Sequence, residues 1–280
     1  MKKRISLFLF ILISVGCSSK FAYDNLDWVS YWYLDDFIDL NDSQSEVVKA
    51  ELSKVLEWHR VSELPQYSTT LPEIKVLIEA DQIVRVDWHG LMDDIRSGWE
   101  RLRAKVIESS VMQIPTLSHR QLEQLFLNLE VRNKEQKEEV SVVIEERTRD
   151  RYEKLVDTLE RFMGDLTEQQ AILADLYIGA SFDTRLMYLS ANAEMQRDIR
   201  QALDSYLDNP STYQLVLIDK KLNSPDQYRS DQLKAYSLEN RVLTVGLLRD
   251  LANTLTTEQK LHLLVKLEDW IELIDSLVKQ

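Results

Sequence analysis

One residue of the chain stands where covalent chemistry is expected. Cys17 is the single cysteine among 280 residues, and the small residue before it, Gly16, lets a peptidase approach the bond between them. The chain opens on the basic residues 2–4, followed by an apolar run from Ile5 to Val15. This run is about half of the roughly 20 residues that a membrane-spanning helix needs. The pattern predicts a lipoprotein signal over residues 1–16, after which the Cys17 thiol carries a diacylglycerol.

The sequence around the predicted cut departs from the usual lipobox in one place. A leucine normally lies three residues before the cysteine, whereas this chain has Ser14 there and Ile13 one step earlier. Two alternatives therefore stay open: an ordinary secreted protein with one free thiol, and a short uncleaved amphipathic anchor. Ser18 is not the aspartate that the usual sorting rule associates with the inner membrane. We expect a protein that is lipid-anchored in the cell envelope, at the outer membrane, with its domain in the periplasm.

An aromatic cluster follows shortly after the predicted anchor. Trp28, Tyr31, Trp32 and Asp35 share one face at helical spacing, and Asp36 adds a second acid. One interpretation is a binding surface for a peptide or glycan, because aromatic side chains are enriched at interfaces. The other is an N-terminal helix that packs across the bundle with its rings buried and its acids exposed. These five residues form the candidate interaction surface.

Other residues that could do chemistry are scattered. Glu57-Trp58-His59 and Asp87-Trp88-His89 repeat an acid–Trp–His order, and His89 with Asp93 could share a metal ion. Zinc sites usually need three or four ligands, and the remaining histidines are isolated in sequence. The chain has no G-x-S-x-G elbow and no glycine-rich phosphate loop. We therefore expect no catalytic residues, no metal, no cofactor and no small-molecule substrate: the protein is predicted not to be an enzyme.

The charge and composition of the mature chain narrow the class of partner. Removal of residues 1–16 leaves 264 residues with 31 Lys+Arg and 47 Asp+Glu, a net charge of 31 − 47 = −16. This balance argues against nucleic acid, whose binding draws on Lys and Arg. It also disfavours lying flat on an anionic membrane, which favours a basic face. With only six glycines and five prolines, the chain favours long helices with few turns.

Four helix starts share one motif, which reads Leu, then Asn, Ser or Thr, two further residues, and Gln. It occurs at Leu40–Gln44, Leu117–Gln121, Leu166–Gln170 and Leu255–Gln259. The pattern is that of a capping box with a hydrophobic staple, in which each cap contributes about 1 kcal/mol. We therefore interpret the motif first as a signal that starts a helix, and not as a binding or catalytic site.

The remaining boundaries predict an all-α fold, an irregular antiparallel helical bundle of about eight to ten helices, several of them long. The expected helices cover residues 23–38, 42–63, 72–80, 87–112, 118–163, 167–189, 191–207, 211–220, 226–253 and 257–279. Residues 132–139 contain no apolar side chain and are expected to be a solvated stretch of one long helix. The domain prediction is a signal over 1–16, a lipidated tether over 17–22, and a helical periplasmic domain over 23–280. The repeated caps suggest related halves, 23–164 and 165–280.

Two resemblances follow from these motifs. One is carried by residues 23–28, 32–36, Leu40, Gln44, 58–60 and 63–67, together reading YDNLDW, WYLDD, L, Q, WHR and ELPQY. This pattern resembles a proteobacterial envelope lipoprotein family of uncharacterised function, which implies a lipid-anchored envelope protein and no named activity. The L-T-x-x-Q motifs at Leu166 and Leu255 are similar to those of periplasmic helical proteins of the Spy chaperone type. That similarity implies client holding, although Spy-type proteins are shorter, are not lipidated and use a basic concave face.

These observations predict a non-enzymatic, lipid-anchored envelope lipoprotein. Its expected partners are the membrane, through the lipid on Cys17, and another envelope protein that it binds in a chaperone-like or scaffolding role. The alternative function is a structural or assembly factor for the outer membrane or its surface polymers.

Overall fold

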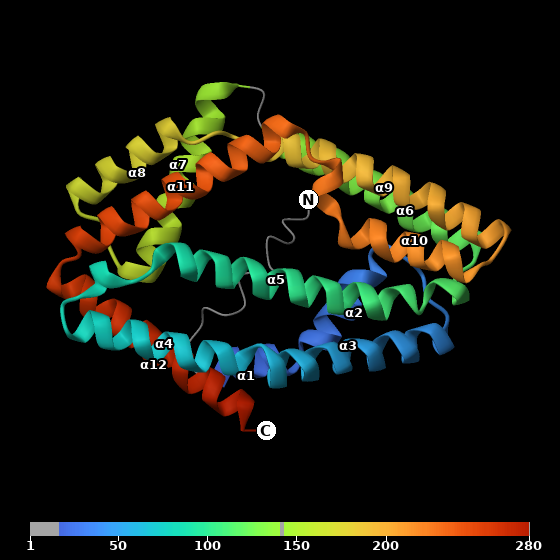
Figure 1. Ribbon diagram of the computed structural model, residues 1–280, viewed down its shortest axis with the longest axis horizontal. Coiled ribbons are helices and arrows are strands. Elements are labelled where there is room, and N and C mark those ends of the chain that lie inside the picture. Colours follow the sequence, from blue (N-terminus) through green and yellow to red (C-terminus); the bar gives the residue numbers. More distant parts are fainter. Residues whose placement is uncertain (1–16, 141–142, 280) are drawn as a thin grey trace.

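Figure 1 shows the computed structural model of the chain, which describes residues 17–140 and 143–279, with side chains from residue 20 onward. The signal predicted for residues 1–16 lies outside the described residues. Within the described ranges the chain folds into helices and contains no strand, which confirms the all-α prediction. None of these helices combines the length and apolar character needed to span a bilayer.

The helices follow one another in this order. The α-helices are α1 (Cys17–Asp24), α2 (Leu26–Asp35), α3 (Asp42–Ser62), α4 (Leu64–Glu79), α5 (Trp88–Val111), α6 (His119–Glu139), α7 (Ile144–Met163), α8 (Glu168–Ala180), α9 (Arg185–Asp208), α10 (Thr212–Asn223), α11 (Asp231–Thr254) and α12 (Thr257–Val278). Short 3-10 helices are η2 (Ile83–Arg85), η3 (Ile114–Thr116) and η4 (Pro225–Tyr228).

The two ends of the elongated molecule are built from different helix groups (Figure 1). At the right-hand end α9 packs on both α6 and α10, and at the upper left α8 packs on α7 and α11. Below them α12 crosses α4 and also contacts α7. The long helices α3 and α5 run side by side along the molecule, and α5 reaches both α10 and α11.

Four clusters of buried hydrophobic residues form the core of the described residues, and Leu255 and Leu263 pack against both the second and the fourth. The first joins α6, α9 and α10 around Leu122 and Ile218, and the second joins α7, α8 and α11 around Ala174. The third joins the first and last helices, α1 and α12, to the start of α4. The fourth lies between α4, η2, α11 and α12 around Ile78. The apolar stripes of the amphipathic helices are thus buried in small clusters at several helix junctions.

Helices α3 and α4 form one kinked rod whose bend lies at Glu63. Glu63 ends α3 and precedes α4, and Pro65 occupies the first turn of α4, where a missing N–H is tolerated. The carboxylate is only 2% exposed, and Arg101 of α5 binds both of its oxygens, at 2.8 and 2.7 Å. The sequence-based expectation that a helix would start near Pro72 was wrong, because Pro72 lies inside α4.

Three other predicted boundaries were also wrong. The single helix expected over 118–163 is two helices, because the backbone is extended at Val140 and Val143. These residues belong to a run rich in β-branched side chains, which lose rotamer freedom in a helix. The helix expected over 167–189 ends at Ala180, and α9 begins at Arg185. The helix expected over 23–38 is the pair α1 and α2, which begins at Cys17.

The remaining expected helices were found close to their predicted limits. The predictions for 42–63, 87–112, 211–220, 226–253 and 257–279 correspond to α3, α5, α10, α11 and α12. Residues 17–22, predicted as a tether, lie within helix α1.

Candidate functional site

All four predicted helix-start motifs are complete capping boxes. In each one the side chain of Asn41, Ser118, Thr167 or Thr256 accepts from the backbone N–H three residues on, and the Gln side chain there accepts from the backbone N–H of the cap. These bonds satisfy N–H groups that a helix start leaves without a partner. The prediction that each motif is a capping box is therefore confirmed.

The four glutamines also pair with one another across the molecule, which the sequence analysis did not foresee. Gln121 donates to the Oε1 of Gln44 at 2.7 Å, and Gln44 donates back at 3.3 Å. Gln170 and Gln259 donate to each other, both at 2.8 Å. Each pair, here called a glutamine clasp, joins two helix starts that are 77 or 89 residues apart in sequence.

The two clasps use the same bonds. In the second clasp, Gln170 donates to the carbonyl of Thr254 at 3.0 Å, and Gln259 donates to the carbonyl of Asp165 at 2.8 Å. In the first clasp, Gln44 and Gln121 donate to the carbonyls of Thr116 and Asp39, at 2.6 and 2.9 Å. Every accepting carbonyl lies two residues before the cap of the partner motif. The donors and acceptors of these amides are thereby satisfied inside the fold.

The clasps give the four capping motifs a second structural role, which is to join distant helix starts. Gln170 is fully buried and Gln259 is 4% exposed, so these amides are not presented to a partner. One clasp lies in each of the suggested halves, 23–164 and 165–280. The weak signal that could have suggested the pairing is the even number of motifs, two in each half.

The candidate interaction surface divides between two faces of α2. Trp28 is 64% exposed and Trp32 is 40% exposed, whereas the Tyr31 hydroxyl donates to Ser45 of α3 at 2.8 Å. The ammonium of Lys49 lies over the Tyr31 ring, 4.3 Å from its centroid. The five predicted residues therefore do not form one surface, because Tyr31 belongs to the contact with α3.

The two acids of the candidate surface, Asp35 and Asp36, are exposed at the end of α2. The chain that follows them is bound by α6. Asn128 donates to the carbonyl of Phe37 at 3.0 Å, and the backbone N–H of Asp39 donates to Gln124 at 3.1 Å. The presented part of the candidate surface is thus Trp28, Trp32 and the two acids.

Helix α1 is docked on the body through Tyr23. Its ring is 5% exposed, and its hydroxyl lies 2.9 Å from Nδ1 of His59. Burial raises the pKa of the Tyr23 phenol to about 12, and burial lowers the pKa of the His59 imidazole, with the Glu63 carboxylate opposing the second shift. Asp24, next along α1, pairs with Arg60 at 3.3 Å. The YDNLDW and WHR segments are therefore two sides of one helix contact.

The acid–Trp–His pattern does not build a shared site. His59 contacts Tyr23, whereas Asp93, the residue paired with His89 in the sequence prediction, binds Arg241 of α11 at 2.6 Å. Among residues 17–140 and 143–279, no group of three or more His, Cys, Asp or Glu residues lies close enough together to hold a metal ion.

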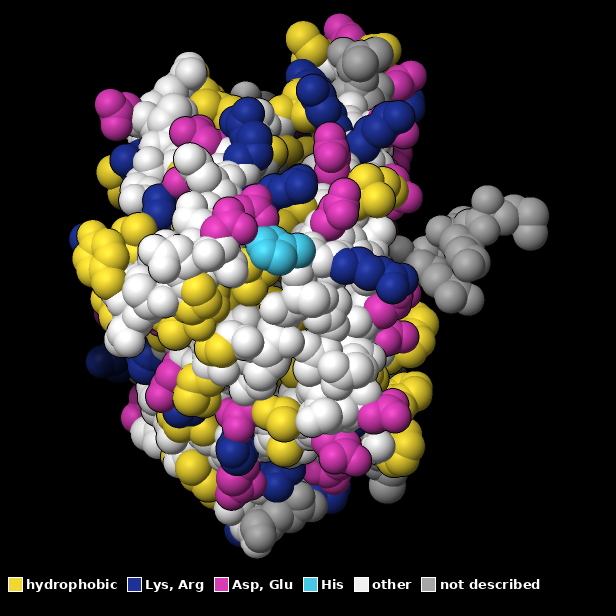
Figure 2. All heavy atoms as spheres, turned by 90° about the vertical axis from the view of Figure 1, so that its right-hand side faces the viewer, with side chains coloured by type: hydrophobic (Ala, Val, Ile, Leu, Met, Phe, Trp, Pro, Cys, Tyr) yellow, Lys and Arg dark blue, Asp and Glu magenta, His cyan; other side chains and the backbone are white. Residues whose placement is uncertain are grey.

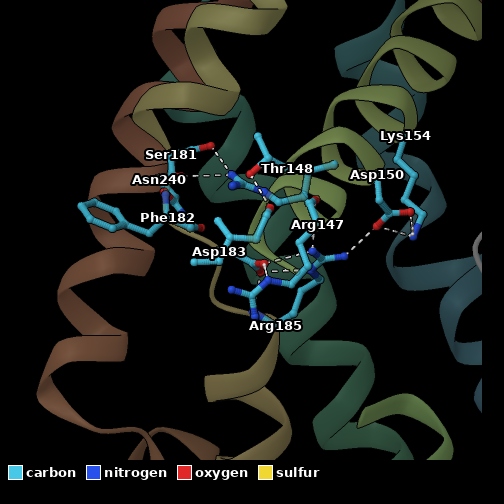
Figure 3. Close-up of polar contacts among 11 residues, drawn as sticks. Arg147, Thr148, Asp150, Lys154, Ser181, Phe182, Asp183, Arg185 and Asn240 are labelled. Carbon is cyan, nitrogen blue, oxygen red and sulfur yellow. Dashed lines mark hydrogen bonds and ion pairs between the residues drawn. The ribbon is translucent and has the colours of Figure 1, made fainter. Parts of the chain in front are cut away.

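A polar cluster fixes the loop between α8 and α9 (Figure 3). Arg185 binds Asp183 at 2.9 Å and Asp150 of α7 at 2.8 Å, and Arg147 lies 3.7 Å from Asp183. The Arg185 hydrogen bond is the main cause of the low pKa of Asp183. Because these arginines bind acids of the chain itself, the cluster acts as a structural lock on the loop.

The side-chain amide of Asn240 completes this lock from α11. It bonds both the N–H and the carbonyl of Phe182, at 2.8 and 2.9 Å. The Phe182 ring stacks on Tyr236, with 3.8 Å between ring centroids. No local sequence pattern predicts the lock, because its residues come from three separate helices and a loop.

The surface carries pairs of large apolar side chains one helical turn apart. Each pair lies on one helix at i, i+4 spacing, and every member is at least 40% exposed: Trp28 and Trp32, Ile95 and Trp99, Leu127 and Val131, Ile172 and Leu176, Leu238 and Val242, and Leu261 and Val265. Figure 2 shows one end of the molecule, where hydrophobic side chains form several groups separated by charged and polar ones. Ile172, Leu176 and Leu261 follow capping boxes at apolar helical spacing, yet all three are exposed.

These features define an all-helical protein with a glutamine clasp in each half and apolar pairs on its surface. The chain belongs to a family of unknown function, DUF6279, whose model matches residues 36–234. That range contains the first clasp, the Glu63 bend and the arginines and aspartates of the loop lock, whereas Asn240 of the lock follows it. No curated protein and no solved structure matches the chain.

Proposed function

We propose that this protein is a lipid-anchored envelope lipoprotein that binds other proteins without catalysis, as a holding or scaffolding factor. The observation that supports the proposal best is the set of exposed apolar pairs on α5, α6, α8, α11 and α12. Two large apolar side chains on adjacent turns offer a partner a ready contact stripe. Exposed apolar groups rimmed by polar residues commonly mark protein contact sites.

The distribution of these pairs favours weak contacts at several places over one tight interface. They lie on helices at both ends of the molecule, separated by charged and polar side chains (Figures 1 and 2). A partner with several exposed apolar segments, such as an unfolded client, can contact more than one pair at once. Linked weak contacts raise the overall affinity without any strong single site. The resemblance of the L-T-x-x-Q motifs to Spy-type proteins agrees with such a role.

The anchor rests on the sequence of residues 1–17. A basic start, an apolar run and a small residue before the single cysteine support lipidation of Cys17. Labelling with radioactive palmitate tests this directly. The wild-type protein is expected to incorporate the label and to fractionate with membranes, and Cys17→Ala is expected to do neither. An unlabelled wild-type protein contradicts the lipoprotein part of the proposal.

The binding role is tested by suppression of aggregation of a thermally unfolding model enzyme, with the lipidated protein in detergent micelles. The double variant Ile172→Ser/Leu176→Ser removes the pair on α8 and is expected to lower suppression by about half, because other pairs remain. Met112→Ser removes a single residue that is 57% exposed, and it is the matched control, expected to behave as wild type. Wild-type protein that leaves aggregation unchanged contradicts the holding role.

The alternative, an assembly factor for the outer membrane or its surface polymers, is separated by the phenotype of a deletion strain. Altered envelope permeability without aggregation of envelope proteins favours the alternative. Aggregation of envelope proteins without a change in permeability favours the holding role.

A further inference from the structure

Only a few helical residues separate residue 17 from the folded body of the protein. Helix α1 begins at Cys17, and six residues later Tyr23 is buried against Leu64, Leu273 and Leu277. Six helical residues rise only about 9 Å. A lipid on residue 17 would therefore hold the body directly against the bilayer, since a docked helix replaces the flexible tether that the sequence suggested.

Three exposed aromatic residues lie on the two helices that follow residue 17, α1 and α2. Phe21 is 71% exposed and lies one helical turn after residue 17, and Trp28 and Trp32 are exposed on α2, which packs against α1. Aromatic rings of this kind, tryptophan above all, favour the interface between lipid tails and water. The remaining aromatic groups of α1 and α2 face the protein, as Tyr23 and Tyr31 do.

The sequence before α1 favours a membrane as the occupant of this aromatic surface. Residues 5–15 form an apolar run that ends two residues before α1 begins. Under the lipid anchor proposed above, and equally if the run is retained, the chain emerges from a membrane at the start of α1. A lipid surface is therefore already next to Phe21 before any protein partner arrives.

We propose that α1 and the outer face of α2 lie on the membrane surface, with Phe21, Trp28 and Trp32 in the headgroup region. The inference rests on the anchoring part of the proposed function and adds to it a fixed orientation of the domain. The apolar pairs on α5, α6, α8, α11 and α12 are then the ones left for proteins. Figure 1 places α8 in the upper part of the molecule and α1 in the lower part, so α8 lies apart from the helices that would contact the bilayer.

The charges near these aromatics indicate the lipid that suits them. Asp35 and Asp36 end α2 and are exposed, while Asp24 is paired with Arg60 at 3.3 Å and with Lys20 at 3.6 Å. An anionic membrane surface would repel Asp35 and Asp36, whereas a zwitterionic surface would not. We expect closer contact with phosphatidylethanolamine than with membranes rich in phosphatidylglycerol.

Spin labels on introduced cysteines test the orientation. The lipidated chain is placed in vesicles of phosphatidylethanolamine with a minor share of phosphatidylglycerol, and the lipid blocks the thiol of Cys17. One variant carries the label at Trp28→Cys, and the matched control carries it at Leu176→Cys, where the native side chains are 64% and 63% exposed. The label at 28 is expected to collide more with dissolved oxygen than with a water-soluble nickel complex, and the label at 176 is expected to show the reverse.

The outcomes separate this inference from the anchor itself. A protein that floats with the vesicles but whose label at 28 is as accessible to nickel as the label at 176 overturns the orientation and leaves the anchor intact. A protein that does not float overturns both. A label at 28 that is aqueous in vesicles but shielded in native envelopes assigns the surface to a protein and likewise overturns the inference. In the supporting case, raising the phosphatidylglycerol content makes the label at 28 more accessible to nickel.

Discussion

At the scale of single residues, one amide group both caps a helix and joins two distant parts of the chain. The Oε1 of Gln170 accepts from the backbone of Thr167, and its Nε2 reaches Gln259 and the carbonyl of Thr254. The capping role could be predicted because it depends on residues three apart. The pairing could not, because 89 residues separate the two glutamines and no local rule links them.

Gln170→Ala tests the clasp against an ordinary cap. The substitution leaves buried partners of Gln170 without hydrogen bonds, which costs about 1–3 kcal/mol for each unsatisfied group. Gln214 is the control, because it follows Ser211 at the same spacing but has no glutamine partner: its side chain accepts from the Ser211 hydroxyl at 3.1 Å and donates to the carbonyl of Ser205 at 3.0 Å. We expect Gln170→Ala to lower the midpoint of thermal unfolding by several degrees and Gln214→Ala to lower it clearly less. Equal losses would show that the clasp adds nothing beyond capping.

The ion pair at the bend between α3 and α4 should respond differently to removal of each partner, because Glu63 is buried and Arg101 is partly exposed. Arg101→Ala leaves the carboxylate of Glu63, 2% exposed, buried without its countercharge, a change that typically costs about 3–5 kcal/mol. Glu63→Gln leaves Arg101, whose side chain is 43% exposed and can be hydrated. Urea unfolding is expected to show a larger loss for Arg101→Ala. The opposite order would contradict the assignment of Glu63 as the buried partner.

At the scale of elements, helix limits could be predicted wherever a local signal marks them. The four capping boxes and Pro210 and Pro225 led to limits close to those observed. The prediction failed where tertiary contacts decide the outcome. The end of α8 at Ala180 depends on the loop lock, in which arginines of α7 and Asn240 of α11 hold residues 181–183. Likewise, helical spacing placed Tyr31 with Trp28 and Trp32, but the contact with α3 removes Tyr31 from the exposed face.

The docking of α1 is expected to weaken in mild acid. Burial lowers the pKa of His59 below its ordinary value, so the undocked state binds a proton more readily than the docked state. The stabilisation is therefore complete above the free histidine pKa of about 6.5, and it decreases as the pH falls from there toward the folded value, by at most about 1.4 kcal/mol per pH unit. Hydrogen exchange of the α1 amides, corrected for intrinsic rates, should accelerate on acidification.

His59→Gln should remove most of this pH dependence of α1 exchange. His119→Gln serves as the control, because the His119 side chain is 63% exposed and lies at the start of α6, 3.7 Å from Asp208 of α9. Acceleration of exchange that persists in His59→Gln would assign the pH dependence to another group.

At the scale of the whole molecule, the excess of acidic residues produces long-range repulsion, which surface ion pairs and the hydrophobic clusters oppose. Residues 17–280 contain 31 Lys+Arg and 47 Asp+Glu, a net charge of 31 − 47 = −16. Many ion pairs in the described residues join exposed side chains one helical turn apart, and such pairs contribute about 0–1 kcal/mol each. The core consists of four small clusters of buried residues at different helix junctions, so repulsion across the molecule is opposed at several places.

Salt is therefore expected to stabilise this protein. Raising sodium chloride from about 0.01 M to about 0.15 M shortens the screening length from roughly 30 Å to roughly 8 Å. Repulsion between distant acids is screened over that range, while close pairs lose little because each is weak. The midpoint of thermal unfolding should rise by a few degrees. Glu123→Gln/Glu130→Gln, which neutralises two exposed acids of α6, should unfold at a higher temperature than wild type in low salt and gain less from added salt. A midpoint that falls with sodium chloride would mean that the surface ion pairs outweigh the net charge.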